Sequence, residues 1–168
     1  MFYGCSSLIS LNLSSFDTSK VTKMKVMFCF CSSLSSINLS NFDVSNVVDM
    51  FGMFGECPKL ISLDLSNFDT SQVTDMGSMF EGCSKLEYIN FKIAELKKLQ
   101  NNNKIFKGIS SNLILCSEKE DWSIFFNSIK NVDCHNMNYR FKCYTNNTNI
   151  VLSKYFCEAC YNNDKYIL

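Results

Sequence analysis

The sequence contains a single histidine, His135, and this scarcity limits the catalytic chemistry that the chain can carry. Any Cys-His or Ser-His nucleophile would have to use it, and no third group that could orient its ring is identifiable. The sequence also lacks a glycine-rich phosphate loop and a pair of carboxylates in unlike surroundings, which acid–base catalysis needs. We therefore expect a protein that is not an enzyme and has no catalytic residue, cofactor or metal site.

An excess of charge and long apolar runs are also lacking. Lys and Arg number 16, as do Asp and Glu, and no basic run occurs, so nucleic acid is not an expected partner. The longest apolar runs are far too short to span a membrane, so we expect no membrane insertion. Residues 1–15 have no basic segment before their apolar residues, so we expect no signal peptide there. Because the chain starts inside a repeat unit, we interpret it as a piece of a longer protein, the alternative being that more repeats once preceded it.

What the sequence does have is a repeat with a period of 26 residues that needs no gap. Methionine, phenylalanine and cysteine recur together in four units, as Met1, Phe2 and Cys5, then Met27, Phe28 and Cys31, then Met53, Phe54 and Cys57, then Met79, Phe80 and Cys83. Three further positions are apolar in every unit, namely Leu8, Leu34, Leu60 and Leu86, then Leu11, Ile37, Leu63 and Ile89, then Leu13, Leu39, Leu65 and Phe91. A fixed period in this range predicts a solenoid, in which each unit buries its apolar side chains against its neighbours.

Within each unit the pattern predicts a strand, a turn and a helical segment. Leu-x-x-Leu-x-Leu predicts a short parallel strand, and Ser-x-Phe-Asp-x-Ser predicts a turn whose Asp and Ser side chains bond nearby backbone N–H groups. We expect that role for Asp17, Asp43 and Asp69; calcium between units is the weaker alternative, because the glycine-rich nonapeptide that binds it is absent. Apolar spacings of three and four over residues 21–28 predict one or two turns of α-helix or 3₁₀-helix.

The whole unit reads Met-Phe-x-x-Cys-x-x-Leu-x-x-Leu-x-Leu-Ser-x-Phe-Asp-x-Ser-x-Val-x-x-Met. Over residues 1–91 it resembles the repeat of the BspA-like (Bacteroides surface protein A-like) leucine-rich-repeat surface proteins. The resemblance implies an α/β fold, a right-handed leucine-rich-repeat solenoid with one parallel sheet and short helical or 3₁₀ backs. It also implies an extracellular or cell-surface protein of bacteria or protists that contacts hosts or neighbouring cells.

After residue 91 the repeat becomes degenerate. Leu96 and Leu99 are three residues apart, so we expect a short helix at residues 93–99. Ile105, Phe106 and Leu115 keep the register, so we then expect a fifth unit that ends in a strand at residues 112–115. A capping box at the start of the next segment precedes apolar residues at helical spacing, namely Trp122, Phe125, Phe126 and Ile129. We therefore expect a solenoid over residues 1–115, an amphipathic capping helix over 116–131 and a cysteine-rich tail module over 132–168.

The ten cysteines form two groups. We expect the repeat cysteines to be small buried side chains in one column: Cys5, Cys31, Cys57 and Cys83. Cys29 breaks the pattern, so we expect it to be exposed, and we interpret Cys116 as a buried strand residue. We expect two disulfides among the tail cysteines Cys134, Cys143, Cys157 and Cys160, because so small a module cannot build a large core. Their pairing is open, and zinc is the alternative.

The outward strand positions are the candidate binding positions. They are mostly small and polar: Ser10, Asn12, Ser36, Asn38, Ser62, Asp64, Tyr88 and Asn90. Tyr88 is the only aromatic residue among them, and aromatic residues are common in binding hot spots. By analogy with the fold we expect non-enzymatic adhesion or recognition through this face, with a protein or glycan on a host or neighbouring cell as the partner. The alternatives are a structural spacer without a ligand and an intracellular scaffold with a zinc-binding tail.

Three Asn-x-Ser/Thr sequences begin at Asn12, Asn38 and Asn146. The last lies in a polar segment and is consistent with secretion. The first two lie on expected strands, where we expect poor access.

Overall fold

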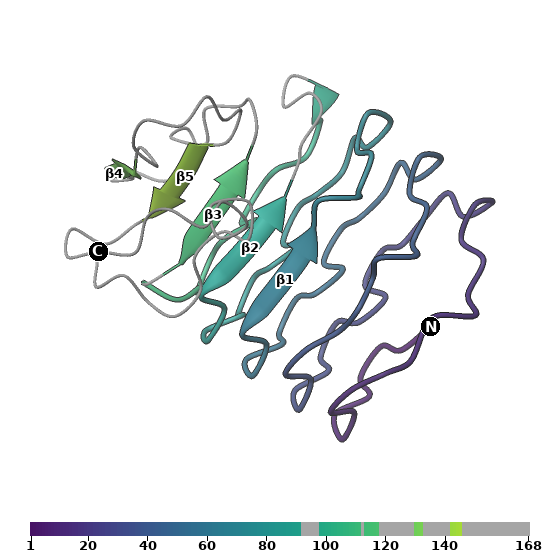
Figure 1. Ribbon diagram of the computed structural model, residues 1–168, viewed down its shortest axis with the longest axis horizontal. Helices are drawn as coiled ribbons and strands as arrows, with labels where there is room; N and C mark the ends of the chain where they lie inside the picture. Colours follow the sequence, from purple (N-terminus) through teal and green to yellow (C-terminus); the bar gives the residue numbers. More distant parts are fainter. Residues whose placement is uncertain (92–97, 112, 118–129, 133–141, 146–168) are drawn as a thin grey trace, which may run out of the picture.

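The structure, a computed structural model, describes residues 1–91, 98–111, 113–117, 130–132 and 142–145. In this part of the chain the 26-residue units lie side by side in sequence order, with the N-terminus at one end of the row (Figure 1). We number them unit 1 (residues 1–26), unit 2 (27–52), unit 3 (53–78), unit 4 (79–104) and unit 5 (from residue 105).

One five-stranded sheet joins the later units in the order β1-β2-β3-β5-β4. The first three strands are parallel: β1 (Ser62–Leu65), β2 (Tyr88–Phe91) and β3 (Ile114–Ser117). The last two continue it in antiparallel pairing: β4 (Lys130–Val132) and β5 (Lys142–Thr145). Leu63 pairs with Ile89, and Ile89 pairs with Leu115. The register of the sequence repeat is therefore the register of the sheet, although the last parallel strand lies two residues later than predicted.

A second series of contacts joins the units opposite the sheet. Single parallel bridges link Lys23, Asp49, Asp75 and Asn101 in turn. Around them the backbone N–H of each unit donates to a carbonyl of the next unit, as from Met24 to Asp49 at 2.8 Å and from Phe28 to Met53 at 2.9 Å. Both sides of a unit thus bond to its neighbours.

The predicted helical segment is a succession of tight turns, so that prediction was wrong. The N–H of Met27 bonds to the carbonyl of Met24, and that of Cys29 to the carbonyl of Val26, both at 3.2 Å. Val26 and Phe30 have positive φ values of 49° and 61°, which interrupt a right-handed helix. Between these turn bonds, the N–H groups of Val26, Phe28 and Phe30 donate to carbonyls of the next unit at 2.8, 2.9 and 2.9 Å, as part of the second series of contacts.

The core is a set of side-chain columns that run through the units. The clearest is a row of stacked phenylalanine rings, with centroid distances of 5.5 Å for Phe2–Phe28, 5.6 Å for Phe28–Phe54, 6.0 Å for Phe54–Phe80 and 5.6 Å for Phe80–Phe106. Each such pair contributes about 0.5–1.5 kcal/mol beyond its buried area. In the methionine column that precedes this row in each unit, the exposed fraction of the residue falls from 84% at Met1 to 9% at Met27 and 0% at Met53. Unit 1 is therefore the exposed end of the row.

The repeat cysteines form a hydrogen-bonded column. Cys31, Cys57 and Cys83 are fully buried, as predicted. Their thiols donate to backbone carbonyls of the preceding unit at 3.1, 3.1 and 3.0 Å, the acceptors being Phe2, Phe28 and Phe54. Burial raises the pKa of Cys83 to about 12, so its sulfur remains a thiol at neutral pH. Cys5, in the first unit, is exposed, contrary to the prediction.

Cys29 is buried, so the prediction that it is exposed was wrong. The equivalent position of unit 3 is Gly55, and a Cβ placed there would lie 3.4 Å from the Cys29 sulfur. The missing side chain of the next unit therefore leaves the space that Cys29 fills.

Several predictions concern residues outside the described part of the chain. They are the helix at 93–99 except for its last two residues, most of the capping helix at 116–131, and most of the tail, including Cys134, Cys157 and Cys160. Cys116 lies on β3 and pairs in register with Cys143 on β5, but their side chains are outside the description. Lys130, at the predicted end of the capping helix, begins β4.

Candidate functional site

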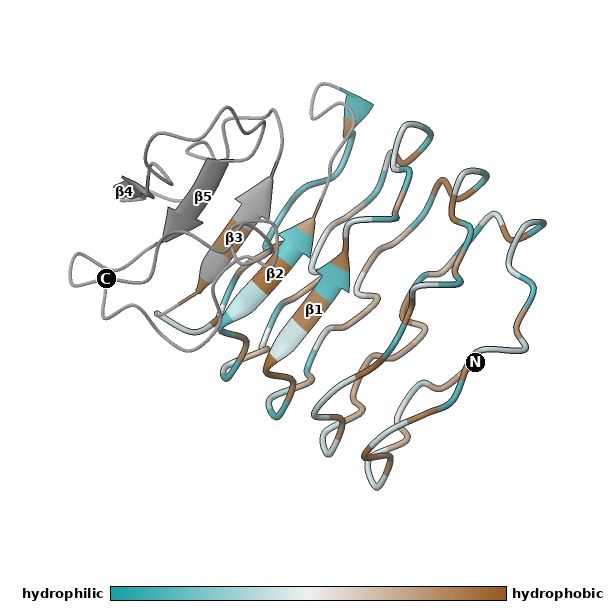
Figure 2. Ribbon diagram, viewed as in Figure 1, coloured by the Kyte–Doolittle hydropathy of each residue, from teal (hydrophilic) through white to brown (hydrophobic). Residues whose placement is uncertain are grey.

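The outward face of the strands carries the polar side chains that the sequence singled out. On β1, Ser62 and Asp64 alternate with the buried Leu63 and Leu65, as the alternating colours of Figure 2 show. On β2, Tyr88 and Asn90 are half-buried and alternate in the same way with buried Ile89 and Phe91. In units 1 and 2 the equivalent side chains are exposed: Ser10, Asn12, Ser36 and Asn38. We call these eight residues the outward face.

One column of the outward face has a structural role that the sequence reasoning missed. The side-chain Oδ1 atoms of Asn12, Asn38 and Asp64 each accept a hydrogen bond at 3.0 Å from the backbone N–H two residues later. These are Asx turns, in which the side chain holds a bend of the backbone; in unit 3 the bend falls at the end of β1. The available signal was the serine two positions after each of these residues. Their carbonyl and carboxylate oxygens are therefore already engaged in the fold.

The neighbouring aspartate column has the turn role that was predicted. Asp17, Asp43 and Asp69 accept hydrogen bonds from the backbone N–H groups of the serines two residues later, at 3.0, 3.0 and 2.9 Å. The hydroxyls of Ser19 and Ser45 also donate to these carboxylates, at 2.6 and 2.7 Å. These side-chain and backbone bonds lower the pKa of Asp17 and Asp43. Among the described residues no group of three or more His, Cys, Asp or Glu side chains could hold a metal ion.

Asparagines next to this turn connect the units. The Nδ2 of Asn41 donates to the carbonyl of Leu13 at 2.9 Å, and that of Asn67 donates to the carbonyl of Phe42 at 3.1 Å. Sequence reasoning missed this ladder, whose signal was the repeated Asn before Phe-Asp in units 2 and 3. It fixes the edge of the outward face from one unit to the next.

Two large apolar side chains are exposed in the column beside the outward face. Ile9 is 65% and Ile61 37% exposed, and they alternate along the column with Ser35 and Glu87. The backbone of this column is paired, because Ser35 N–H donates to Ile9 O and Ile61 N–H donates to Ser35 O, both at 3.3 Å. The face therefore offers apolar area beside its small polar side chains.

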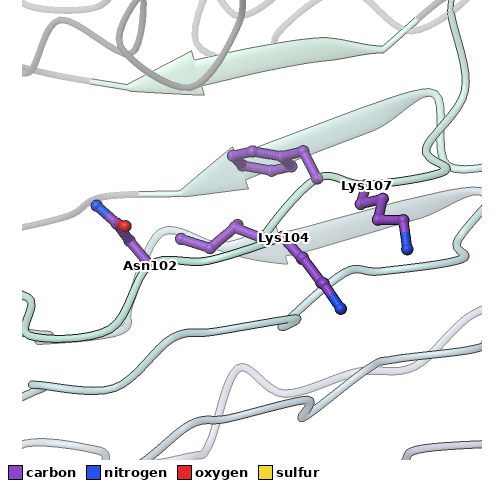
Figure 3. Close-up of a pocket in the computed structure, with 5 residues that line it drawn as sticks. Asn102, Lys104 and Lys107 are labelled. Atoms are coloured by element: carbon purple, nitrogen blue, oxygen red, sulfur yellow. The ribbon is translucent and has the colours of Figure 1, made fainter.

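A pocket of about 220 Å³ lies on unit 5 and its junction with unit 4, and none of its lining residues belongs to a strand. It is lined by Asn102, Lys104, Ile105, Phe106 and Lys107. In Figure 3 the side chains of Lys104 and Lys107 extend to the same side, away from Asn102. The sequence did not indicate this pocket, and the outward face does not contribute to it.

The stacked units and their outward face define the class: a repeat protein with an ordered, extended surface. The chain belongs to DUF285, a family described as "Mycoplasma protein of unknown function", whose model matches residues 1–118. The match covers the first four units and the part of the fifth through β3. No curated protein and no solved structure matches the chain. Among the described residues no helix has the length and apolar character needed to cross a membrane.

Proposed function

We propose that this protein is a non-enzymatic recognition or adhesion module that binds a protein or a glycan through its outward face. In this proposal the stack is a right-handed leucine-rich-repeat solenoid of the BspA-like class, carried outside the cell or at its surface. Membership of a repeat family over residues 1–118 is compatible with that class. The partner lies on a host or on a neighbouring cell.

The observation that carries the proposal is the regular spacing of the outward face. Residues 26 apart pair across β1 and β2, as Ser62 does with Tyr88, so equivalent side chains recur about every 4.8 Å. Short side chains on a paired backbone lose little rotamer entropy when a partner covers them. Ile9 and Ile61 add apolar area, and Tyr88 adds an aromatic group. Such a surface suits an extended partner.

Charge insertion on the face tests this function. The immobilised chain is presented to a glycan array and to intact cells, and saturable binding is measured. Ser36→Arg and Ser62→Arg place a long cation in the middle of the face and are expected to weaken binding at least tenfold. Gln72→Arg is the matched control, because Gln72 is exposed and lies outside the face. Equal binding by all three variants would place the partner elsewhere.

The second candidate is a structural spacer, and the Asx turns favour it. Asn12, Asn38 and Asp64 are explained by the fold alone, since their oxygens hold the turns. A spacer would show no saturable binding to any glycan or cell type. The alternative of an intracellular scaffold with a zinc-binding tail is separated by intact-mass measurement with and without reductant, together with zinc quantification. Disulfides without zinc support the extracellular module.

A further inference from the structure

Two Asn-Leu-Ser sequences lie on the outward face, and we propose that Asn12 and Asn38 are acceptor sites for N-linked glycans. The Asn-x-Ser sequence is the one that oligosaccharyl transferase recognises. The proposal rests on the extracellular location proposed above, because a chain meets this enzyme only when it enters a secretory pathway. It adds a covalent modification to a face so far considered only for binding.

Access to the two asparagines is better than their position on expected strands suggested. Asn12 and Asn38 are both exposed, whereas the central leucines of the two sequences, Leu13 and Leu39, are only 1% and 2% exposed. Each asparagine therefore points away from the core, and neither lies in a strand, although the sequence predicted one in each of these units. A glycan attached there would extend into solvent without displacing a buried side chain.

The hydrogen bonding of these asparagines is compatible with the chemistry. Oδ1 accepts the N–H of Ser14 or Ser40 at 3.0 Å. In glycosylation Nδ2 forms a bond to the anomeric carbon of the sugar, the bond from that carbon to the lipid pyrophosphate breaks, and one amide proton leaves. The product is a secondary amide whose Oδ1 still accepts the same hydrogen bond. The Asx turn therefore survives the modification.

In other asparagines of the repeat, the amide nitrogen is used in a hydrogen bond within the fold. Asn41 and Asn67 use Nδ2 to donate to carbonyls of the preceding unit, and neither is followed two residues later by Ser or Thr. Unit 3 provides a natural control, because Asp64 forms the same turn before Leu65-Ser66 but has no amide nitrogen. The repeat thus contains two acceptor sites and one unmodifiable equivalent in the same geometry.

The proposal also narrows the surface available to a partner. Equivalent positions of adjacent units lie about 4.8 Å apart, so glycans on Asn12 and Asn38 of the same molecule would crowd each other. The proposal therefore requires a glycan on at least one of these two residues in each molecule. Either glycan would cover the outward face of units 1 and 2. A protein partner of the glycosylated chain would then contact units 3 and 4, where Ser62 and Tyr88 lie, so the Ser36→Arg variant described above applies to protein made without glycans.

The test maps glycans on the full chain, carrying an added secretory leader and Asn146→Gln to remove the third sequence. The chain is translated into microsomes and, in parallel, recovered from the medium of eukaryotic cells. Release with peptide N-glycosidase in ¹⁸O-water then marks each modified asparagine by its conversion to aspartate. We expect the label at residue 12 or 38 in more than half of the molecules and its loss in the Asn12→Gln, Asn38→Gln double variant.

The Asp64→Asn variant is the matched gain-of-site control, since it completes the same sequence in the same turn. We expect it to add label at residue 64. Unlabelled asparagines at both 12 and 38 in chains that reached the microsomal lumen would overturn the proposal, whether or not residue 64 is labelled. The glycan mapping involves no binding partner, so its result remains valid even if the binding assays show no adhesion function.

Discussion

The phenylalanine column gives a prediction whose magnitude follows from position in the row. Phe54 is fully buried, with Phe28 stacked at 5.6 Å on one side and Phe80 at 6.0 Å on the other. Phe2 is half-buried and has one stacked neighbour, Phe28 at 5.5 Å, and a tilted contact with Phe16 at 6.2 Å. Truncating a buried phenylalanine to alanine costs about 3–5 kcal/mol. We expect about 4 kcal/mol for Phe54→Ala and about 2 kcal/mol or less for Phe2→Ala, since Phe2 has less area to lose and one stacked pair fewer.

The assay is urea unfolding of the three proteins, with the slope m checked for constancy because repeat arrays can lose two-state behaviour. Phe30→Ala is the control, since Phe30 is 47% exposed and lies outside the core. Its loss should cost less than about 1 kcal/mol, mainly from the edge contact with Tyr3. An equal loss of stability for Phe2→Ala and Phe54→Ala would refute the argument that the units bury one another cumulatively.

Three further predictions follow from the turns, the thiols and the carboxylates. Glu56→Gly should raise the free energy of unfolding by about 0.5–1 kcal/mol in the same assay. Glu56 is exposed and has a φ of 56°, a conformation that glycine adopts without strain, and the equivalent positions of other units are Gly4 and Gly82. A loss of stability would contradict this. Among the five cysteines whose side chains the structure describes, Cys5 alone should be alkylated rapidly in the native protein, as read by peptide mass spectrometry. Cys57 and Cys83 should react only after unfolding, and rapid labelling of Cys57 would show that the column opens. The pKa values of Asp17 and Asp43 are lowered in the folded state, so their contribution to the free energy of unfolding is present above about pH 4 and is lost as the pH falls through the lower folded-state values. The free energy of unfolding should therefore change less with acid pH in the Asp17→Asn, Asp43→Asn double variant. Identical pH curves for the variant and the unchanged protein would argue against this contribution.

The register of the stack could be read from the sequence because every unit keeps the same length. Leu63, Ile89 and Leu115 pair as the 26-residue period predicts, even though unit 5 retains few of the repeat residues. The aspartate turn was also predictable, since Asp-x-Ser places a short acceptor two residues before an N–H group. Both features depend on local spacing, which substitutions elsewhere in the unit leave unchanged.

The turns at residues 25–30 were mispredicted as a helix because the residues that decide the conformation are not of the types that usually mark a left-handed turn. Apolar spacings of three and four indicate a helix, but Val26 and Phe30 adopt positive φ values that such residues rarely show. Glycines at the equivalent positions, Gly4 and Gly52, carry the signal in other units. Comparing the units position by position, rather than reading one unit alone, would have indicated a left-handed turn. The burial of Cys29 needed the same comparison, because it depends on Gly55 of the next unit.

Asn38 separates the structural and the binding roles of the outward face within a single position. Asp64 forms the same Asx turn in unit 3, so Asn38→Asp should retain the hydrogen bond to Ser40 and the stability of the protein. Asn38→Ala removes the acceptor and should cost about 1 kcal/mol in urea unfolding of protein made without glycosylation. If the side-chain amide of Asn38 also contacts a partner, Asn38→Asp should weaken binding while leaving stability unchanged. Loss of stability in both variants would instead mean that the amide nitrogen has a structural role, and the Asx turn would not account for this residue.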